Sequence, residues 1–175
     1  MKVDRKLLNE ILQARESRVA IQREIISEYN LPLISITLNI PGSKKDSLKI
    51  RKIYRECIRV VKIKLLKQRE STIVYERERL SAEGPEFFVV VDGFAAKTLK
   101  KMFIQVENEH PLGRLFDIDV ISKDFSLVSR KDVNVPLRKC IICEDAAINC
   151  ISMRKHKRDE IIKTVDNLID QFLIF

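Results

Sequence analysis

The chain contains 175 residues, 45% of them hydrophobic, and has a net charge of +8, so it can bury the core of one domain and favours anionic partners. Only 4 glycines and 5 prolines are present, which excludes long low-complexity segments, and no apolar run reaches the roughly 18 residues of a membrane span. The N-terminal residues lack the apolar region of a secretory signal. We therefore expect a cytoplasmic protein whose four cysteines are thiols or metal ligands rather than disulfides.

The first predicted element is a helix over residues 4–29, in which leucines and isoleucines recur with helical spacing. A short β-branched strand is expected over 33–39, followed by a Pro-Gly turn. The next helix covers about 48–67, and Asp46 or Ser47 is its candidate N-cap residue.

Two strands are then expected, over 71–82 and 86–92, followed by a helix that ends near residue 107. The sequence RLFDIDVI, residues 114–121, predicts another strand, and residues 124–130 are expected to pair with it as a hairpin.

The rest of the chain, from about residue 139, is predicted to be helical. The order of elements in the core is β-α-β-β-α-β, which is typical of an α+β fold with a single mixed or antiparallel sheet and flanking N- and C-terminal helices. We expect one domain with an N-terminal helix over 1–30, an α+β core over 31–130 and a C-terminal helical segment over 131–175.

The positive charge is concentrated in residues 44–69, which contain eleven Lys or Arg and two acids, a local charge of +9. Such a segment attracts nucleic acid, a phosphorylated cofactor or an acidic protein. A solvated helix face explains the same pattern equally well.

An acid pair, Asp117 and Asp119, lies in the middle of the strand over 114–121. Alternate residues of a strand share a face, so the two carboxylates project together, about 7 Å apart at Cβ, opposite a core face of Phe116 and Ile118. Oxygen ligands of this kind hold Mg²⁺ or Mn²⁺ on substrate phosphates. The alternative is the polar, solvent-facing side of an edge strand.

Residues near the acid pair are candidates for the same site. Arg114, three residues before Asp117, is a candidate phosphate cation. Just upstream, Glu109 and His110 are candidates for the general base, and Glu107 is a candidate third ligand or base. A surface or structural role is the alternative for His110, which precedes a proline.

Two other stretches are candidate phosphate-binding segments. The turn PGSKKDS, residues 41–47, is followed by a helix, so Lys44 and Lys45 could hold a phosphate there, although the Walker A pattern is absent. In RESRVAIQ, helical spacing places three long polar side chains on one face, where they suit either anion binding or plain surface: Arg15, Arg18 and Gln22.

A cysteine and histidine cluster follows near the C-terminus, with the spacing C-x₂-C-x₆-C-x₅-H: Cys140, Cys143, Cys150 and His156. Three thiolates and one imidazole can form a tetrahedral zinc site. If residues 138–156 are helical, however, Cys143 and Cys150 share one helix face and simply pack against the sheet.

Several stretches together resemble the holo-citrate lyase synthase family (apo-citrate lyase phosphoribosyl-dephospho-CoA transferase, the CitX family). The matching stretches are RESRVAIQ, PLISITLNIPGSKKDS, EHPLGRLFDIDVI, the Ser-Arg pair that ends at Arg130, and RKCIICEDAAINC with His156. We include Arg130 among the candidate substrate-binding residues.

The resemblance implies a nucleotidyltransferase. Its donor would be triphosphoribosyl-dephospho-CoA, made by a separate protein, and its acceptor a serine of the citrate lyase acyl-carrier subunit, with pyrophosphate released. Partners would then be this carrier and the donor, with no membrane and no nucleic acid. Two alternatives remain from the residues alone. One is a basic nucleic-acid-binding module, although a chain without tryptophan has few side chains on which bases can stack. The other is a zinc-stabilised interaction module.

Overall fold

The computed structural model describes residues 5–42, 45–69 and 72–174. Its four strands are β1 (Leu33–Leu38), β2 (Thr72–Ser81), β3 (Gly84–Asp92) and β4 (Phe116–Ile121). Its helices are α1 (Arg5–Tyr29), α2 (Leu48–Leu66), α3 (Ala96–Glu109), the 3₁₀ turn η1 (Lys131–Val133), α4 (Ala147–Ser152) and α5 (Arg158–Leu173). The strands form one open sheet in the order β2-β3-β1-β4, and every neighbouring pair is antiparallel. The predicted α+β class with a single sheet and helices at both ends is therefore confirmed.

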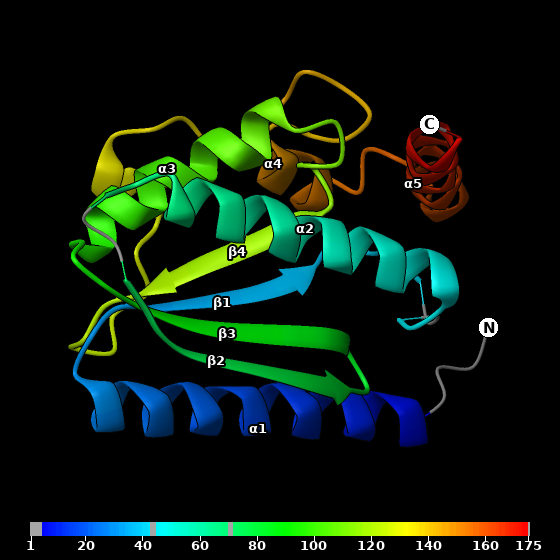
Figure 1. Ribbon diagram of the computed structural model, residues 1–175. Coiled ribbons are helices and arrows are strands. Elements are labelled where there is room, and N and C mark those ends of the chain that lie inside the picture. The colour runs from blue at the N-terminus through cyan, green and yellow to red at the C-terminus, as the bar shows by residue number, and fades with distance from the viewer. Residues whose placement is uncertain (1–4, 43–44, 70–71, 175) are drawn as a thin grey trace.

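Helices cover both faces of the sheet, α2 and α3 on one and α1 on the other (Figure 1). An apolar cluster lies on each face, and one is larger than the other. On one face, Ile36 of β1, Val89 of β3 and Ile118 of β4 join the larger core under α2 and α3. On the other face, Leu33 and Phe88 pack against the C-terminal half of α1 in a smaller cluster. Beyond the smaller cluster, the side chains on the same face of the sheet are polar. The acid pair lies in this polar region.

Local sequence signals account for the ends of the elements around the site. The Ser47 side chain accepts a hydrogen bond of 3.2 Å from the Ile50 backbone N–H and so caps α2, as one of the two predicted caps. Gly84 closes the β2–β3 hairpin with φ +106°, and a Cβ there would lie 2.6 Å from the Lys45 carbonyl oxygen. This close approach brings the segment before α2 against the hairpin turn.

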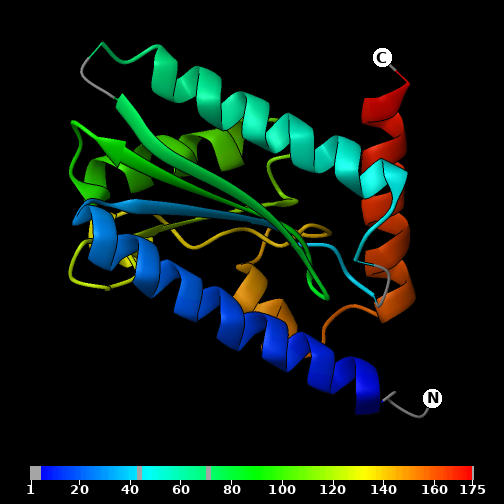
Figure 2. The ribbon, with the colours of Figure 1, turned by 60° about the horizontal axis from the view of Figure 1, so that its bottom comes forward.

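The last helix, α5, stands across one end of the layers beside the start of α2, as Figure 2 shows. Lys49 Nζ of α2 lies 2.5 Å from Asp170 Oδ1 of α5. Ion pairs also involve three other basic residues of α2, namely Arg51, Arg59 and Lys62. Part of the charge of the basic segment is thus neutralised within the protein.

Of two predictions for the segments after β4, one is wrong and one is confirmed in part. Residues 139–146 are not helical, because the backbone closes on itself: Cys140 N–H donates to the Asp145 carbonyl (2.7 Å) and Ala147 N–H to the Arg138 carbonyl (2.8 Å). The helix begins only at Ala147. Residues 124–130 do turn back and pair with β4, as predicted, through an antiparallel bridge between Ile121 and Leu127 and a hydrogen bond from Val128 N–H to the Val120 carbonyl (2.9 Å).

None of the helices in the described part of the chain is both long enough and apolar enough to cross a membrane.

Candidate functional site around Asp117 and Asp119

The two acids share the face of β4 opposite Phe116 and Ile118, as predicted, and the structure adds that this face is turned toward α1. In the sheet register Asp117 is paired with Thr37 and Asp119 with Ser35 of β1. The Thr37 hydroxyl donates to Asp117 Oδ2 at 3.3 Å. The Asp117 and Asp119 side chains are 47% and 43% exposed, so both carboxylates remain open to a ligand.

Two side chains of α3 reach around the edge of the sheet to this strand. Lys100 Nζ donates to the Ile118 carbonyl (2.9 Å) and lies 3.9 Å from Asp119 Oδ1. Glu107 Oε1 accepts the Ile118 backbone N–H at 3.3 Å. Backbone groups that an edge strand would leave open are therefore satisfied by side chains, which fixes both α3 residues beside the acid pair.

A buried carboxylate holds two arginines at the same place. Glu107 is 3% exposed and lies 2.5 Å from both Arg130 Nη2 and Arg138 Nη2. Arg138 Nη2 is also 4.0 Å from Asp117 Oδ1. Charge-assisted pairs of this kind fix the orientation of the guanidinium groups, so they are in place before an anionic ligand arrives.

The pKa of Asp119 is raised to about 6, first by burial and then by the neighbouring Asp117 carboxylate, while Lys100 opposes the shift. Like charges placed together in this way favour either a bound proton or a bound cation. Strongly shifted pKa values of this kind cluster at functional sites.

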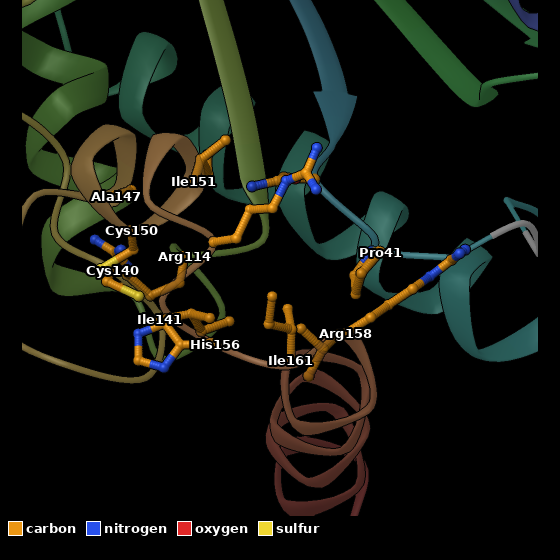
Figure 3. Close-up of a pocket in the computed structure, with 13 residues that line it drawn as sticks. Pro41, Arg114, Cys140, Ile141, Ala147, Cys150, Ile151, His156, Arg158 and Ile161 are labelled. Carbon is orange, nitrogen blue, oxygen red and sulfur yellow. The ribbon is translucent and has the colours of Figure 1, made fainter.

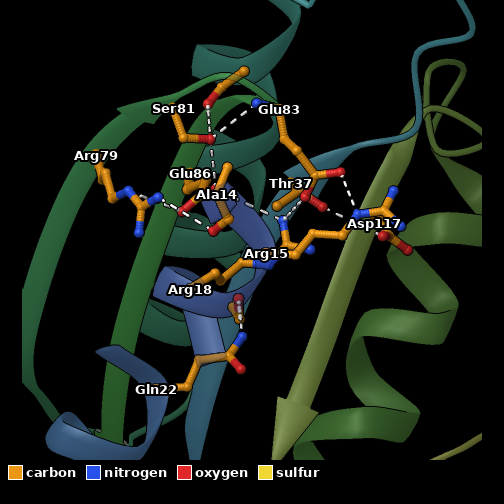
Figure 4. Close-up of polar contacts among 12 residues, drawn as sticks. Ala14, Arg15, Arg18, Gln22, Thr37, Arg79, Ser81, Glu83, Glu86 and Asp117 are labelled. Atoms are coloured by element: carbon orange, nitrogen blue, oxygen red, sulfur yellow. Dashed lines mark hydrogen bonds and ion pairs between the residues drawn. The ribbon is translucent and has the colours of Figure 1, made fainter. Parts of the chain in front are cut away.

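On the other side of Asp117, residues of α1 face a carboxylate cluster (Figure 4). Arg15 Nε lies 2.7 Å from Glu83 Oε1, and Arg18 Nη1 lies 3.1 Å from Glu83 Oε2. Gln22 Nε2 donates to Ser35 Oγ at 2.9 Å. The three predicted residues of α1 therefore do share one face, and that face is turned to the sheet beside the acid pair.

Lys45 completes this side of the site. Its Nζ donates to the Ile40 carbonyl at 2.5 Å, and burial lowers its pKa. A small pocket joins it to two arginines of α1 and to the first acid of the pair, with lining residues that include Arg15, Arg18, Thr37, Lys45, Glu83 and Asp117. Lys44, its predicted partner, lies outside the described residues.

A pocket of about 380 Å³ opens on the opposite side of the acid pair, and we call it the larger pocket because it exceeds the small pocket beside Lys45. Both aspartates and the cations Lys100, Arg130 and Arg138 line it. Four exposed apolar side chains line it as well: Leu127, Leu137, Ile148 and Ile151. An apolar wall next to charged groups suits a ligand with both phosphate and hydrophobic parts.

Three predicted residues lie elsewhere. Arg114 lines a neighbouring pocket of about 500 Å³ together with Arg154 and Arg158 (Figure 3). His110 Nε2 lies 3.2 Å from Glu56 Oε1 on the α2 side of the sheet, with its ring packed on Phe116. Glu109 is exposed and accepts a hydrogen bond from Gln105 on the same helix. Neither His110 nor Glu109 is brought near the acid pair.

The cysteine and histidine cluster is brought together. Ligand atoms of Cys140, Cys143, Cys150 and His156 all lie within 4.8 Å of one another, although residues 139–146 form a loop rather than the helix on which the packing alternative depended.

A family model described as apo-citrate lyase phosphoribosyl-dephospho-CoA transferase matches residues 6–172. The chain belongs to this family. It is similar to a Vibrio cholerae protein named probable apo-citrate lyase phosphoribosyl-dephospho-CoA transferase, with 32% identity over 94% of this chain and 92% of the relative. Proteins of the same name without "probable" from Shigella flexneri and Escherichia coli O1:K1 are each 33% identical over 92% of this chain and 87% of their own length.

Sequence reasoning missed three contributors to the site in this family member: Lys100, Arg138 and Glu83. In the sequence, Lys100 is one of several lysines of a predicted helix and is not distinguished from the others. Its role follows only from its contact with β4, the strand at the edge of the sheet. Arg138 follows a loop that no periodic pattern marks. Glu83 lies in the turn of the β2–β3 hairpin, a position from which nothing in the sequence predicts contact with α1.

Proposed function

We propose that this chain transfers the phosphoribosyl-dephospho-CoA group to apo-citrate lyase. The proposal rests on the family match together with one structural observation: Asp117 lies between two groups of cations. Arg15, Arg18 and Lys45 lie on one side, and Lys100 and Arg138 lie on the other. Such an arrangement suits a polyphosphate ligand that crosses the acid pair.

The donor in this proposal is triphosphoribosyl-dephospho-CoA, and the acceptor is a serine hydroxyl of the citrate lyase acyl-carrier subunit. The serine oxygen forms a bond to the phosphorus nearest the ribose, the bond from that phosphorus to the pyrophosphate breaks, and the serine proton passes to water. The reaction is therefore a nucleotidyl-type transfer, in which catalysis consists mainly of positioning and electrostatic stabilisation of phosphate charge.

The acid pair provides oxygen donors that suit Mg²⁺ or Mn²⁺, which prefer carboxylates together with substrate phosphates. The raised pKa of Asp119, caused first by burial and then by the neighbouring Asp117 carboxylate, supports this fit, because a bound cation would offset both effects. Asp117, Asp119 and the hydroxyl of Thr37 would hold the ion, which when bound supplies charge neutralisation of the phosphates.

The arginines of the site are assigned one common task. Arg15 and Arg18 are held by Glu83, and Arg138 by Glu107, so each guanidinium is oriented before the donor binds. We assign them to the phosphates that leave as pyrophosphate, because a preorganised cation stabilises charge that develops on a leaving group.

The apolar wall of the larger pocket has a place in the same scheme. Ile148 and Ile151 of α4 are exposed beside the acid pair, where they add apolar surface but no charge. We assign this wall to the adenine ring or pantetheine arm of the donor, since both bury hydrophobic area on binding.

The test is incubation of the purified protein with triphosphoribosyl-dephospho-CoA and the apo acyl-carrier subunit in Mg²⁺ buffer. The expected results are a mass gain of one phosphoribosyl-dephospho-CoA group on the carrier and release of one pyrophosphate per carrier. A carrier whose acceptor serine is replaced by alanine provides the matched control and should gain no mass. Absence of any mass gain on the wild-type carrier would refute the function.

A further inference from the structure

A second site lies in the C-terminal segment, apart from the acid pair. Four side chains from three pieces of structure converge there: Cys140 and Cys143 from the loop over 139–146, Cys150 from α4, and His156 from the link between α4 and α5. We propose that these four residues bind one structural Zn²⁺ ion.

The distances between the ligand atoms fit this ion. Cys143 Sγ lies 3.5 Å from Cys150 Sγ and 3.4 Å from His156 Nε2. A tetrahedral Zn²⁺ with Zn–S bonds of about 2.3 Å places its thiolate sulfurs roughly 3.8 Å apart. A disulfide would need sulfurs about 2.05 Å apart, so the cysteines of the cluster are not bonded to each other.

The chemistry of the four donors selects the metal. Thiolate and imidazole are soft or borderline ligands that favour zinc over Mg²⁺, Mn²⁺ or Ca²⁺, which prefer oxygen. A full set of four protein ligands leaves no position for water or substrate, which is the arrangement of structural rather than catalytic zinc.

The backbone around the cluster is shaped to bring the ligands together. Ile142 N–H donates to Cys140 Sγ at 3.4 Å, within the short C-x₂-C turn. Arg154 has φ +48°, a left-handed conformation that is uncommon outside glycine, and it turns the chain so that His156 returns toward Cys143. Glu160 Oε2 lies 3.9 Å from His156 Nδ1, where a carboxylate can orient a metal-binding imidazole.

Packing alone does not explain this convergence. Cys140 and Cys143 are only partly buried, so they contribute little to an apolar core. The cluster ties the loop after Arg138 to α4, which presents Ile148 and Ile151 to the larger pocket. Zinc would therefore hold one wall of the pocket in place, although the metal site itself does not depend on the proposed transfer reaction.

The test is elemental analysis of the full chain, expressed without a metal-affinity tag and purified without chelators. We expect one zinc per chain in the wild type and loss of at least about nine-tenths of it in Cys143→Ser and His156→Ala. His156→Cys should restore zinc binding because a fourth thiolate can replace the imidazole. Cys57→Ala, which removes the one cysteine outside the cluster, should keep the metal, since Cys57 lies on the buried face of α2, in the core.

A second measurement covers the event that the variants fail to fold. Wild-type protein is stripped with a chelator and reloaded with Co²⁺, whose absorption should show the thiolate charge-transfer and tetrahedral ligand-field bands of a Cys₃His site. Hydrogen exchange in residues 138–156 should quicken about tenfold on stripping, while β1 and β3 stay protected. A wild-type chain without zinc that also gives no such cobalt bands, or full zinc retention in both Cys143→Ser and His156→Ala, would overturn the proposal.

Discussion

Arg138 comes from a loop that follows the sheet, yet its Nη2 atom lies 4.0 Å from Asp117 Oδ1 on the edge strand. The same nitrogen is 2.5 Å from the buried Glu107, which anchors it. One arginine therefore connects the C-terminal segment to the acid pair and faces the pocket in which we place the phosphates.

Replacement of Arg138 by alanine should lower kcat/KM for the donor by about tenfold to a hundredfold, the worth of one hydrogen bond to a charged group. The fold should survive, because Arg130 still neutralises Glu107. Lys139→Ala is the matched control, since this neighbouring cation pairs with the exposed Glu144 instead. Steady-state kinetics measure kcat/KM for the donor in both variants. An equal loss of kcat/KM in the two would show that Arg138 has no special role.

Glu107 should matter for stability far more than its neighbour Glu109. Glu107→Ala leaves two arginines without their buried partner and the Ile118 N–H without its acceptor, so we expect a loss of about 3 kcal/mol in the free energy of unfolding. Glu109→Ala, at an exposed position, should change it by no more than about 0.5 kcal/mol and leave transfer intact. Urea unfolding monitored by circular dichroism measures both values.

Asp119→Asn should abolish transfer and yet stabilise the protein at neutral pH. The folded-state pKa of Asp119, about 6, is above the ordinary value of 3.8, so the folded protein loses stability relative to the unfolded chain as pH rises through this window. The gain of the variant over wild type should grow from near zero at pH 4 to about 1 kcal/mol at pH 7, a figure discounted for the half-exposed side chain.

Thermal or urea unfolding of both proteins at several pH values tests this sign. Lys100, Asp117, Glu107 and Arg18 all act on Asp119, so the comparison uses the difference between variant and wild type at each pH. A variant less stable than wild type at pH 7 would mean that the charge of Asp119 does not destabilise the folded protein.

Ile151→Ser should raise KM for the donor several-fold with little effect on kcat, because the side chain adds apolar contact area outside the reacting atoms. Its side chain is 75% exposed, so stability should hardly change. Met153→Ser, at a residue 74% exposed but outside the pocket lining, is the control for lost surface hydrophobicity. Equal KM values in the two variants would show that the apolar wall does not contact the donor.

The sequence alone predicts which site residues share a face of a strand or of a helix. Strand alternation placed Asp117 and Asp119 on one face, and helical spacing placed Arg15, Arg18 and Gln22 on another, because both periodicities depend on local geometry alone. The structure adds that these two faces meet, which depends on α1 covering the sheet beside β4.

Long-range and loop features were beyond such patterns. Helical periodicity in the segment around Cys140 and Cys143 predicted a helix, but the closed turn between Arg138 and Ala147 prevails there. The contacts of Lys100 and Glu107 with Ile118 follow from the edge position of β4, which only the strand order reveals. Arg114 is close to Asp117 in sequence, yet the turn over residues 111–115 directs it to a different pocket.

The most direct test of the central claim is the intact mass of the apo acyl-carrier subunit after reaction with wild-type protein and with Asp117→Asn, at equal enzyme and donor concentrations. The account predicts complete modification by the wild type and at least about a thousandfold slower modification by the variant, whose urea midpoint stays at or above that of the wild type. Modification by Asp117→Asn at the wild-type rate would contradict it.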